Sequence, residues 1–121
     1  MRFFEYGDYI ISKWMPRENF QGYLNILHGG IQATLMDEIA SWVVIAQLHS
    51  AGYTSKAEIR YHKTAFVNKG PITLRARSIG MRRNLADIEV RLLDATGMKC
   101  SSGLFTYFTY PENRVKAKMF S

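Results

Sequence analysis

The chain has 121 residues, of which 47% are hydrophobic and 21% charged, and its formal net charge at pH 7 is +6. This length predicts a single domain over residues 1–121, and the composition excludes both a disordered chain and a membrane-spanning one. The positive charge suits an anionic partner such as a phosphorylated small molecule, a nucleic acid or a membrane surface, and does not choose between them.

The first predicted elements are a strand and a long helix. Residues 5–14 mix aromatic and β-branched side chains and predict a strand, and residues 16–22 have the Pro, Asn and Gly content of a loop. Residues 30–48 carry apolar side chains on nearly every side of a 3.6-residue period. A helix that is apolar almost all round must be buried almost all round, so we expect a sheet to wrap around it.

The rest of the chain predicts strands. Apolar and polar residues alternate with a period of two in residues 54–65, 72–77 and 86–92, and residues 103–110 form an aromatic-rich last strand. Helices do not alternate with these strands, so an antiparallel meander covered by the one helix is predicted. The single cysteine, Cys100, cannot form an internal disulfide and is expected in the core of a protein from the reducing cytoplasm.

A polar stripe interrupts the apolar helix. Its members recur at helical spacing and are Gly30, Thr34, Asp37, Glu38 and Ser41. A buried carboxylate costs several kcal/mol unless it is paired, so two of them on one stripe indicate a functional site. The alternative is that both carboxylates face solvent at an edge that the sheet leaves uncovered, and periodicity alone does not decide between the two.

The helix is preceded by the turn His28-Gly29-Gly30. A helix N-terminus presents unpaired N–H groups and the positive end of the helix dipole, and glycine lets a ligand approach that backbone closely. Such a turn could hold a carbonyl oxygen as negative charge develops on it. Alone, a glycine pair before a helix is more often just a tight turn, and a lone histidine is more often a structural hydrogen-bonding residue.

The spacing of these two features predicts a dimer. Gly30 and Asp37 are seven positions apart, which is roughly 10 Å along a helix. A base or nucleophile must lie about 3 Å from the atom on which it acts, so one helix cannot easily supply both groups to one carbonyl. A second copy of the helix, packed antiparallel on the first, would bring Asp37 of one chain to the glycine turn of the other.

Residues 22–38, GYLNILHGGIQATLMDE, resemble the signature of the hotdog-fold thioesterases of the phenylacetate-pathway type, within the 4-hydroxybenzoyl-CoA thioesterase superfamily. That signature is a Gly-Tyr loop, His-Gly-Gly, and an Asp nine positions after the His, which is the spacing of His28 and Asp37. Residues 54–61, TSKAEIRY, are similar to the family's strand after the helix. The resemblance implies an α+β hotdog fold, with one long central helix wrapped by a curved antiparallel β-sheet and with dimers that can join into tetramers.

The resemblance also implies an activity. The reaction would be hydrolysis of an acyl-CoA thioester by a homo-oligomer, with no metal or other cofactor and no nucleic-acid or membrane partner. The Gly29 N–H, in the turn formed with His28 and Gly30, would polarise the thioester carbonyl, and Asp37 of the neighbouring chain would be the general base or the nucleophile. The residues expected to contact the substrate or its attacking water are Asn25, Glu38, Thr54 and Ser55. Candidates for the CoA phosphates are Arg75, Arg77, Arg82 and Arg83.

The sequence departs from the family pattern at two positions. Several members carry an Asn six positions before the His, where this chain has Gly22, and a usual Pro is replaced by Thr64. A non-catalytic hotdog module that binds an acyl ligand is therefore an alternative, and a nucleic-acid-binding domain is supported by charge alone. A hydratase of the same fold would pair an Asp with a nearby His on one chain, and Asp37 has no such partner in the sequence.

Overall fold

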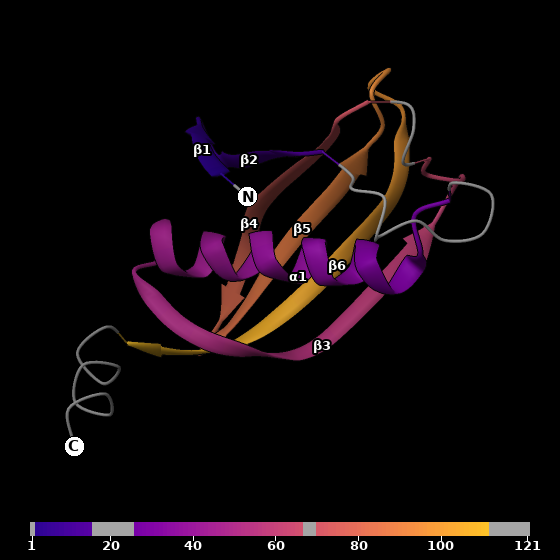
Figure 1. Ribbon diagram of the computed structural model, residues 1–121. Coiled ribbons are helices and arrows are strands. Elements are labelled where there is room, and N and C mark those ends of the chain that lie inside the picture. The colour runs from indigo at the N-terminus through magenta and orange to yellow at the C-terminus, as the bar shows by residue number, and fades with distance from the viewer. Residues whose placement is uncertain (1, 16–25, 67–69, 112–121) are drawn as a thin grey trace.

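In the computed structural model, which describes residues 2–15, 26–66 and 70–111, one helix lies across one face of a six-stranded antiparallel sheet (Figure 1). The elements are β1 (Arg2–Tyr6), β2 (Tyr9–Trp14), α1 (Gly29–Ala46), β3 (Ser50–Tyr61), β4 (Ile72–Arg82), β5 (Leu85–Leu93) and β6 (Lys99–Pro111). The sheet curves around α1, and its strand order is β1-β2-β4-β5-β6-β3. The predicted α+β architecture of one long helix wrapped by an antiparallel sheet is confirmed.

Two details of the predicted sheet are wrong. The N-terminal segment forms a hairpin rather than one strand, because Gly7 adopts a positive φ of 61° and the chain reverses between β1 and β2. The sheet is also not a simple meander, since β3 does not lie between β2 and β4 but at the far edge, beyond β6. After α1 the chain enters β3, which pairs with β6 at one edge of the sheet, while β4 pairs with β2.

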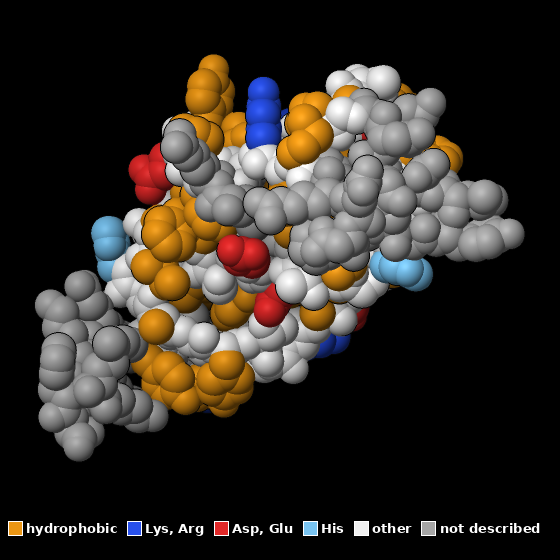
Figure 2. All heavy atoms as spheres, viewed as in Figure 1, with side chains coloured by type: hydrophobic (Ala, Val, Ile, Leu, Met, Phe, Trp, Pro, Cys, Tyr) orange, Lys and Arg blue, Asp and Glu red, His pale blue; other side chains and the backbone are white. Residues whose placement is uncertain are grey.

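The sheet buries one side of α1. The buried residues recur at helical spacing and are Gln32, Leu35, Met36, Ile39, Ala40, Val43 and Val44. On other sides of the helix, Trp42 remains 39% exposed and Ile45 49% exposed. Figure 2, in which α1 faces the viewer, shows hydrophobic and acidic side chains together on this surface. Burial almost all round, as the sequence predicted, is therefore not achieved within one chain.

The core lies between α1 and the concave face of the sheet. Along β5, buried and half-buried residues alternate as predicted, with Ile88 and Val90 fully inside. In β3 the predicted alternation buries little, and Ala57 is exposed because the strand lies at the sheet edge. Cys100 is buried as expected, and burial raises the pKa of its thiol. Within the described residues, no helix is both long and apolar enough to cross a membrane.

Candidate active site

The Asp37 side chain lies at the middle of α1 and points at β3 and β6. Thr54 of β3 and Tyr107 of β6 are directly opposite each other in the sheet, so both side chains face the helix. The Thr54 hydroxyl donates to Oδ1 of Asp37 at 2.6 Å. The Tyr107 hydroxyl lies 2.6 Å from the same Oδ1 and 2.8 Å from the Asp37 carbonyl oxygen. The carboxylate is thus held between the helix and two strands.

A β-bulge in β3 allows Thr54 to reach Asp37. The register against β6 shifts between Thr54 and Lys56, so that Ser55 is the extra residue. With this insertion both Thr54 and Ala57 face the helix, although strict alternation would place them on opposite faces. The Ser55 hydroxyl donates to the carbonyl of Thr106 at 3.1 Å. Ser55 therefore shapes the strand and does not contact the Asp37 carboxylate.

Both donors bind the same oxygen of Asp37. Within the described residues, no donor contacts the second oxygen, Oδ2. Tyr107 is only 2% exposed, and this burial, reinforced by the hydrogen bond to Asp37, raises the pKa of its phenol well above the usual range. The hydroxyl therefore stays protonated and remains a donor at any physiological pH. Because the hydrogen bonds at Oδ1 fix the orientation of the carboxylate, Oδ2 is the oxygen available to accept a proton or attack a carbonyl carbon.

The glycine turn forms the start of the helix. His28 is the N-cap residue, and its carbonyl accepts the N–H of Gln32 at 3.0 Å, while its exposed side chain makes no capping hydrogen bond. The preceding amides in the helix belong to Gly29, Gly30 and Ile31. None of these three N–H groups has an acceptor in the described part of the chain. Unpaired donors at the positive end of the helix dipole can stabilise an oxyanion.

A buried glutamine, which the sequence analysis missed, fixes the segment before this turn. Gln32 is only 4% exposed; its side-chain amide donates to the carbonyl of Leu27 at 3.0 Å and accepts from the Ser101 hydroxyl at 2.8 Å. The Leu27 N–H in turn donates to the Ala65 carbonyl at 2.7 Å. These bonds attach the segment to β6 and to the chain after β3. The signal in the sequence is one polar residue on the buried stripe of an apolar helix.

The two glycines have different surroundings. The Tyr61 hydroxyl donates to the Gly29 carbonyl at 2.8 Å, and a Cβ on Gly29 would lie 3.1 Å from Cζ of the Tyr61 ring. Gly29 is therefore needed for close packing against β3. A Cβ on Gly30 would meet no atom of the described residues within 4 Å, and the Gly30 carbonyl accepts the Thr34 hydroxyl at 2.9 Å. The backbone at Gly30 is accordingly open to an approaching ligand.

The predicted site residues fall into two groups. The first group is Asp37 with Thr54. The second group is the turn His28-Gly29-Gly30 at the start of α1. Gly29 and Asp37 are eight positions apart on a continuous helix, a separation of roughly 12 Å. Glu38 is exposed, and its carboxylate makes no hydrogen bond or ion pair with the described residues, so it does not join Asp37. Asn25, and with it Gly22, lies outside the described residues.

The arginines predicted to hold CoA phosphates do not lie beside Asp37. Arg75 and Arg77 project from the opposite, outer face of the sheet, with their guanidinium carbons 4.4 Å and 5.2 Å from the centre of the Tyr9 ring. Arg82 pairs with Asp87 at 3.1 Å, and Arg83 occupies the turn after β4 with a φ of 59°. In the described ranges, no three His, Cys, Asp or Glu side chains are grouped so that they could hold a metal ion.

The chain is similar to thioesterases and esterases in both sequence and structure. The family model of the thioesterase superfamily matches residues 24–101. A candidate esterase of Thermoplasma acidophilum is 24% identical over 97 residues, a match that covers 78% of this chain and 70% of that protein.

Several solved structures share the fold. A hypothetical thioesterase of Streptococcus pneumoniae, solved with coenzyme A, superimposes with a TM-score of 0.83 at 22% identity, covering 91% of this chain and 85% of that one. A Streptococcus mutans protein bound to acetyl-CoA gives a TM-score of 0.81 at 20% identity, covering 90% and 87%. Two further structures are variants of the S. pneumoniae protein, one with an Asp and one with a Thr replaced by Ala.

Proposed function

The chain belongs to the thioesterase superfamily and is a thioester hydrolase, and from this premise we propose that it hydrolyses acyl-CoA to the free acid and CoA. The observation that carries the proposal is the Asp37 carboxylate, which two hydroxyls anchor at Oδ1 and which has no donor among the described residues at Oδ2. Coenzyme A and acetyl-CoA in two proteins of the same fold support the substrate class. Two solved variants of one of those proteins replace an Asp and a Thr by Ala, which are the same two residue types as Asp37 and Thr54.

The proposed reaction begins at Oδ2 of Asp37. This oxygen accepts a proton from a water molecule as the water oxygen attacks the thioester carbon. The carbonyl oxygen becomes negative and is stabilised by the free N–H of Gly29. Collapse of this intermediate breaks the carbon–sulfur bond, and the CoA thiolate takes the proton back from Asp37. Direct attack by Oδ2 on the thioester carbon would instead break the carbon–sulfur bond, release the CoA thiolate and give an acyl-enzyme anhydride. Water then hydrolyses the anhydride to the free acid and the Asp37 carboxylate, so both routes use the same oxygen.

The active unit in this proposal is a homodimer. The roughly 12 Å between Gly29 and Asp37 within one helix is too long for both to act on one carbonyl. Two antiparallel helices that cross near Ala33, which lies midway between those residues, would place each Asp37 at the other chain's turn. Gly30, Ala33 and Thr34 are small and not fully buried, so they permit a close approach. The exposed side chains of Trp42 and Ile45 would gain cover from a second copy.

The experiment is thioester hydrolysis by the purified protein over a panel of acyl-CoA chain lengths. We expect Asp37→Asn to lower kcat by at least about a hundredfold, because amides do not accept protons at neutral pH. The matched control is Asp8→Asn, which makes the same change in the exposed turn after β1. Unchanged activity in Asp37→Asn would exclude Asp37 from the mechanism. Tight acyl-CoA binding without turnover by the unmodified protein would instead establish a non-catalytic acyl-CoA-binding module.

A further inference from the structure

Arginines are aligned in one row across the outer face of the sheet, which faces away from α1. In the strand register Arg60 is opposite Ser102, Ser102 is opposite Arg91, and Arg91 is opposite Arg75. Side chains opposite each other on one face have Cβ atoms about 5 Å apart, and like charges at that spacing repel each other. Arg91 and Arg75 stand in that relation, whereas Arg60 and Arg91 lie two strands apart, about 10 Å, with Ser102 between them. An anion over Ser102 would lie within reach of both of these arginines.

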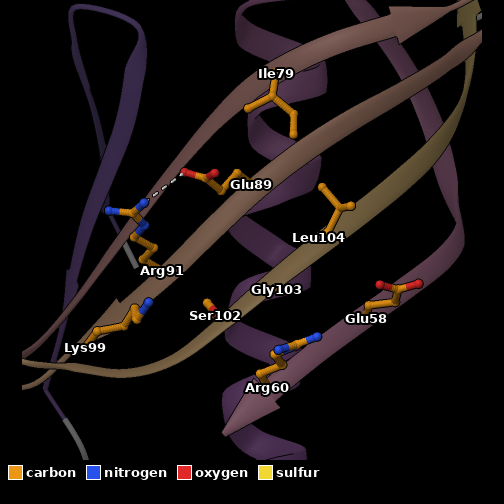
Figure 3. Close-up of a pocket in the computed structure, with 9 residues that line it drawn as sticks. All are labelled: Glu58, Arg60, Ile79, Glu89, Arg91, Lys99, Ser102, Gly103 and Leu104. Atoms are coloured by element: carbon orange, nitrogen blue, oxygen red, sulfur yellow. Dashed lines mark ion pairs between the residues drawn. The ribbon is translucent and has the colours of Figure 1, made fainter. Parts of the chain in front are cut away.

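A groove of about 370 Å³ runs over this row. Its lining residues are Glu58, Arg60, Ile79, Glu89, Arg91, Lys99, Ser102, Gly103 and Leu104. Figure 3 shows that Arg91 and Lys99 lie on one side of Ser102 and Arg60 on the other. The apolar side chains of Ile79 and Leu104 lie toward the other end of the groove and are partly exposed. One end is thus cationic and the other has an apolar surface.

The carboxylates of the groove neutralise its cationic end only in part. Glu89 lies between two arginines, 3.5 Å from Nε of Arg77 and 3.6 Å from a terminal nitrogen of Arg91. Glu58 pairs with Lys56 at 2.8 Å. Neither Arg60 nor Lys99 forms an ion pair of 4 Å or less with a residue that the structure describes. Two cations beside Ser102 are therefore available to an external anion.

The hydroxyl at the centre of this end is also held in place. Oγ of Ser102 lies within hydrogen-bond distance of Nε2 of His62, at 2.9 Å. When Nε2 of His62 carries the proton and donates to Oγ, the serine hydroxyl keeps its own proton for one directional hydrogen bond, beside the planar donors of the guanidinium groups. That combination matches the oxygens of a phosphate better than a single carboxylate, because phosphate presents more acceptors and more charge.

We propose that the cationic end of this groove, formed by Arg60, Arg91, Lys99 and Ser102, binds the phosphate group of a small molecule. The rest of that molecule would lie along the groove toward Leu104 and Ile79. The phosphate has two chemical sources, the CoA part of the substrate or a separate phosphorylated metabolite. The first source rests on the proposed acyl-CoA thioesterase function, and the second does not.

The site itself is tested by titrating the ¹⁵N-labelled protein with inorganic pyrophosphate and following amide shifts by NMR. We expect saturable shifts in β3, β5 and β6 around Ser102. Arg60→Gln and Lys99→Gln should each raise the pyrophosphate Kd about tenfold, as the loss of a charge-assisted hydrogen bond predicts. Both side chains are exposed, so these variants should remain folded. Lys13→Gln, which removes an exposed charge of the same sheet outside the groove, is the control and should leave the Kd unchanged.

Kinetics then identify the source of the phosphate. If it belongs to CoA, Arg60→Gln and Lys99→Gln will raise KM for acyl-CoA but not for the matching acyl-pantetheine, which lacks the nucleotide phosphates. If it belongs to a separate metabolite, KM for both substrates will be unchanged. An absence of saturable shifts, or an equal loss of affinity in Lys13→Gln, would overturn the site. The titration is also repeated in Asp37→Asn, whose substitution lies on the other face of the sheet. An unchanged pyrophosphate Kd in that variant would show that the phosphate site does not depend on the proposed hydrolysis.

Discussion

The phenolic oxygen of Tyr107 lies 2.6 Å from Oδ1 of Asp37, although the two residues are 70 positions apart in sequence. This contact joins the last strand to the centre of the helix. It also leaves the opposite carboxylate oxygen unoccupied by any donor among the described residues.

Tyr107→Phe removes the hydroxyl and keeps the ring. We expect kcat to fall about tenfold with little change in KM, because the carboxylate loses orientation while the substrate contacts remain. Steady-state kinetics on one acyl-CoA substrate give both constants. Tyr6→Phe makes the same chemical change at an exposed tyrosine of β1 and serves as the control. Equal kcat values in the two variants would show that the Tyr107 hydroxyl does not orient the reacting group.

Thr54 contributes only a hydroxyl to Asp37, so a serine at this position should preserve the hydrogen bond. Thr54→Ser is expected to retain most of kcat, whereas Thr54→Ala should lower it about tenfold or more. The comparison removes the effect of the methyl group. If serine and alanine reduce kcat equally, the β-branched shape of Thr54 and not its hydrogen bond is what the site requires.

Gly29→Pro tests the backbone donor directly. Position 29 is the first residue of α1, where proline is tolerated, and the φ of −57° and ψ of 143° at His28 suit the residue before a proline. The substitution therefore removes one N–H and should preserve the helix. Gly29→Ala also adds a Cβ next to Tyr61 but keeps the N–H. We expect the proline variant to lose at least about tenfold more kcat than the alanine variant.

Mixed dimers test whether the site is shared between chains. Asp37→Asn and Gly29→Pro should each be nearly inactive alone. After unfolding and refolding together in equal amounts, half of the dimers contain both variants, and each has one intact site. Activity should recover to about one quarter of that of the unmodified protein. Recovery that does not exceed the sum of the two separate variants would show that Asp37 and Gly29 act within one chain.

The raised pKa of Tyr107 predicts a loss of stability in alkali. The unfolded chain releases the phenolic proton near pH 10, whereas the buried phenol keeps it to a higher pH, so the folded state then binds more protons. The free energy of unfolding should therefore fall as pH rises above about 10. Urea unfolding at about pH 9 and about pH 11 measures the fall, which should be smaller in Tyr107→Phe. Identical falls in both proteins would contradict the buried, protonated phenol.

The local patterns of the sequence predicted most of the secondary structure. The helix was placed from its apolar period, and β4 and β5 from alternation, because each is a repeat within a few residues. The position of β3 beyond β6 could not be predicted, since nothing within that strand specifies which neighbour it pairs with. The exposure of one face of α1 could not be predicted, because the helix shows the same apolar periodicity whether the sheet of its own chain or another surface covers that face.

The arrangement of the candidate site could be predicted only in part, because much of it depends on tertiary contacts. The spacing of His28 and Asp37 lies within one helix and its cap, so it is visible in the sequence. Tyr107 could not be found this way, because its hydroxyl meets Asp37 only after the sheet has folded. Strict alternation from Ala57 would also have directed Thr54 to the outer face, and only the bulge at Ser55 reverses this. The resemblance to a known family, and not periodicity, identified Thr54.

The edge strand β3 forms hydrogen bonds with α1 at two places in the candidate site. Before its bulge it supplies Thr54 to the carboxylate, and at its end it supplies Tyr61 to the Gly29 carbonyl. One strand thus donates both hydrogen bonds. A small displacement of β3 against α1 would therefore alter both hydrogen bonds at once, and a contact made along this edge of the sheet would affect Asp37 and the Gly29 turn together.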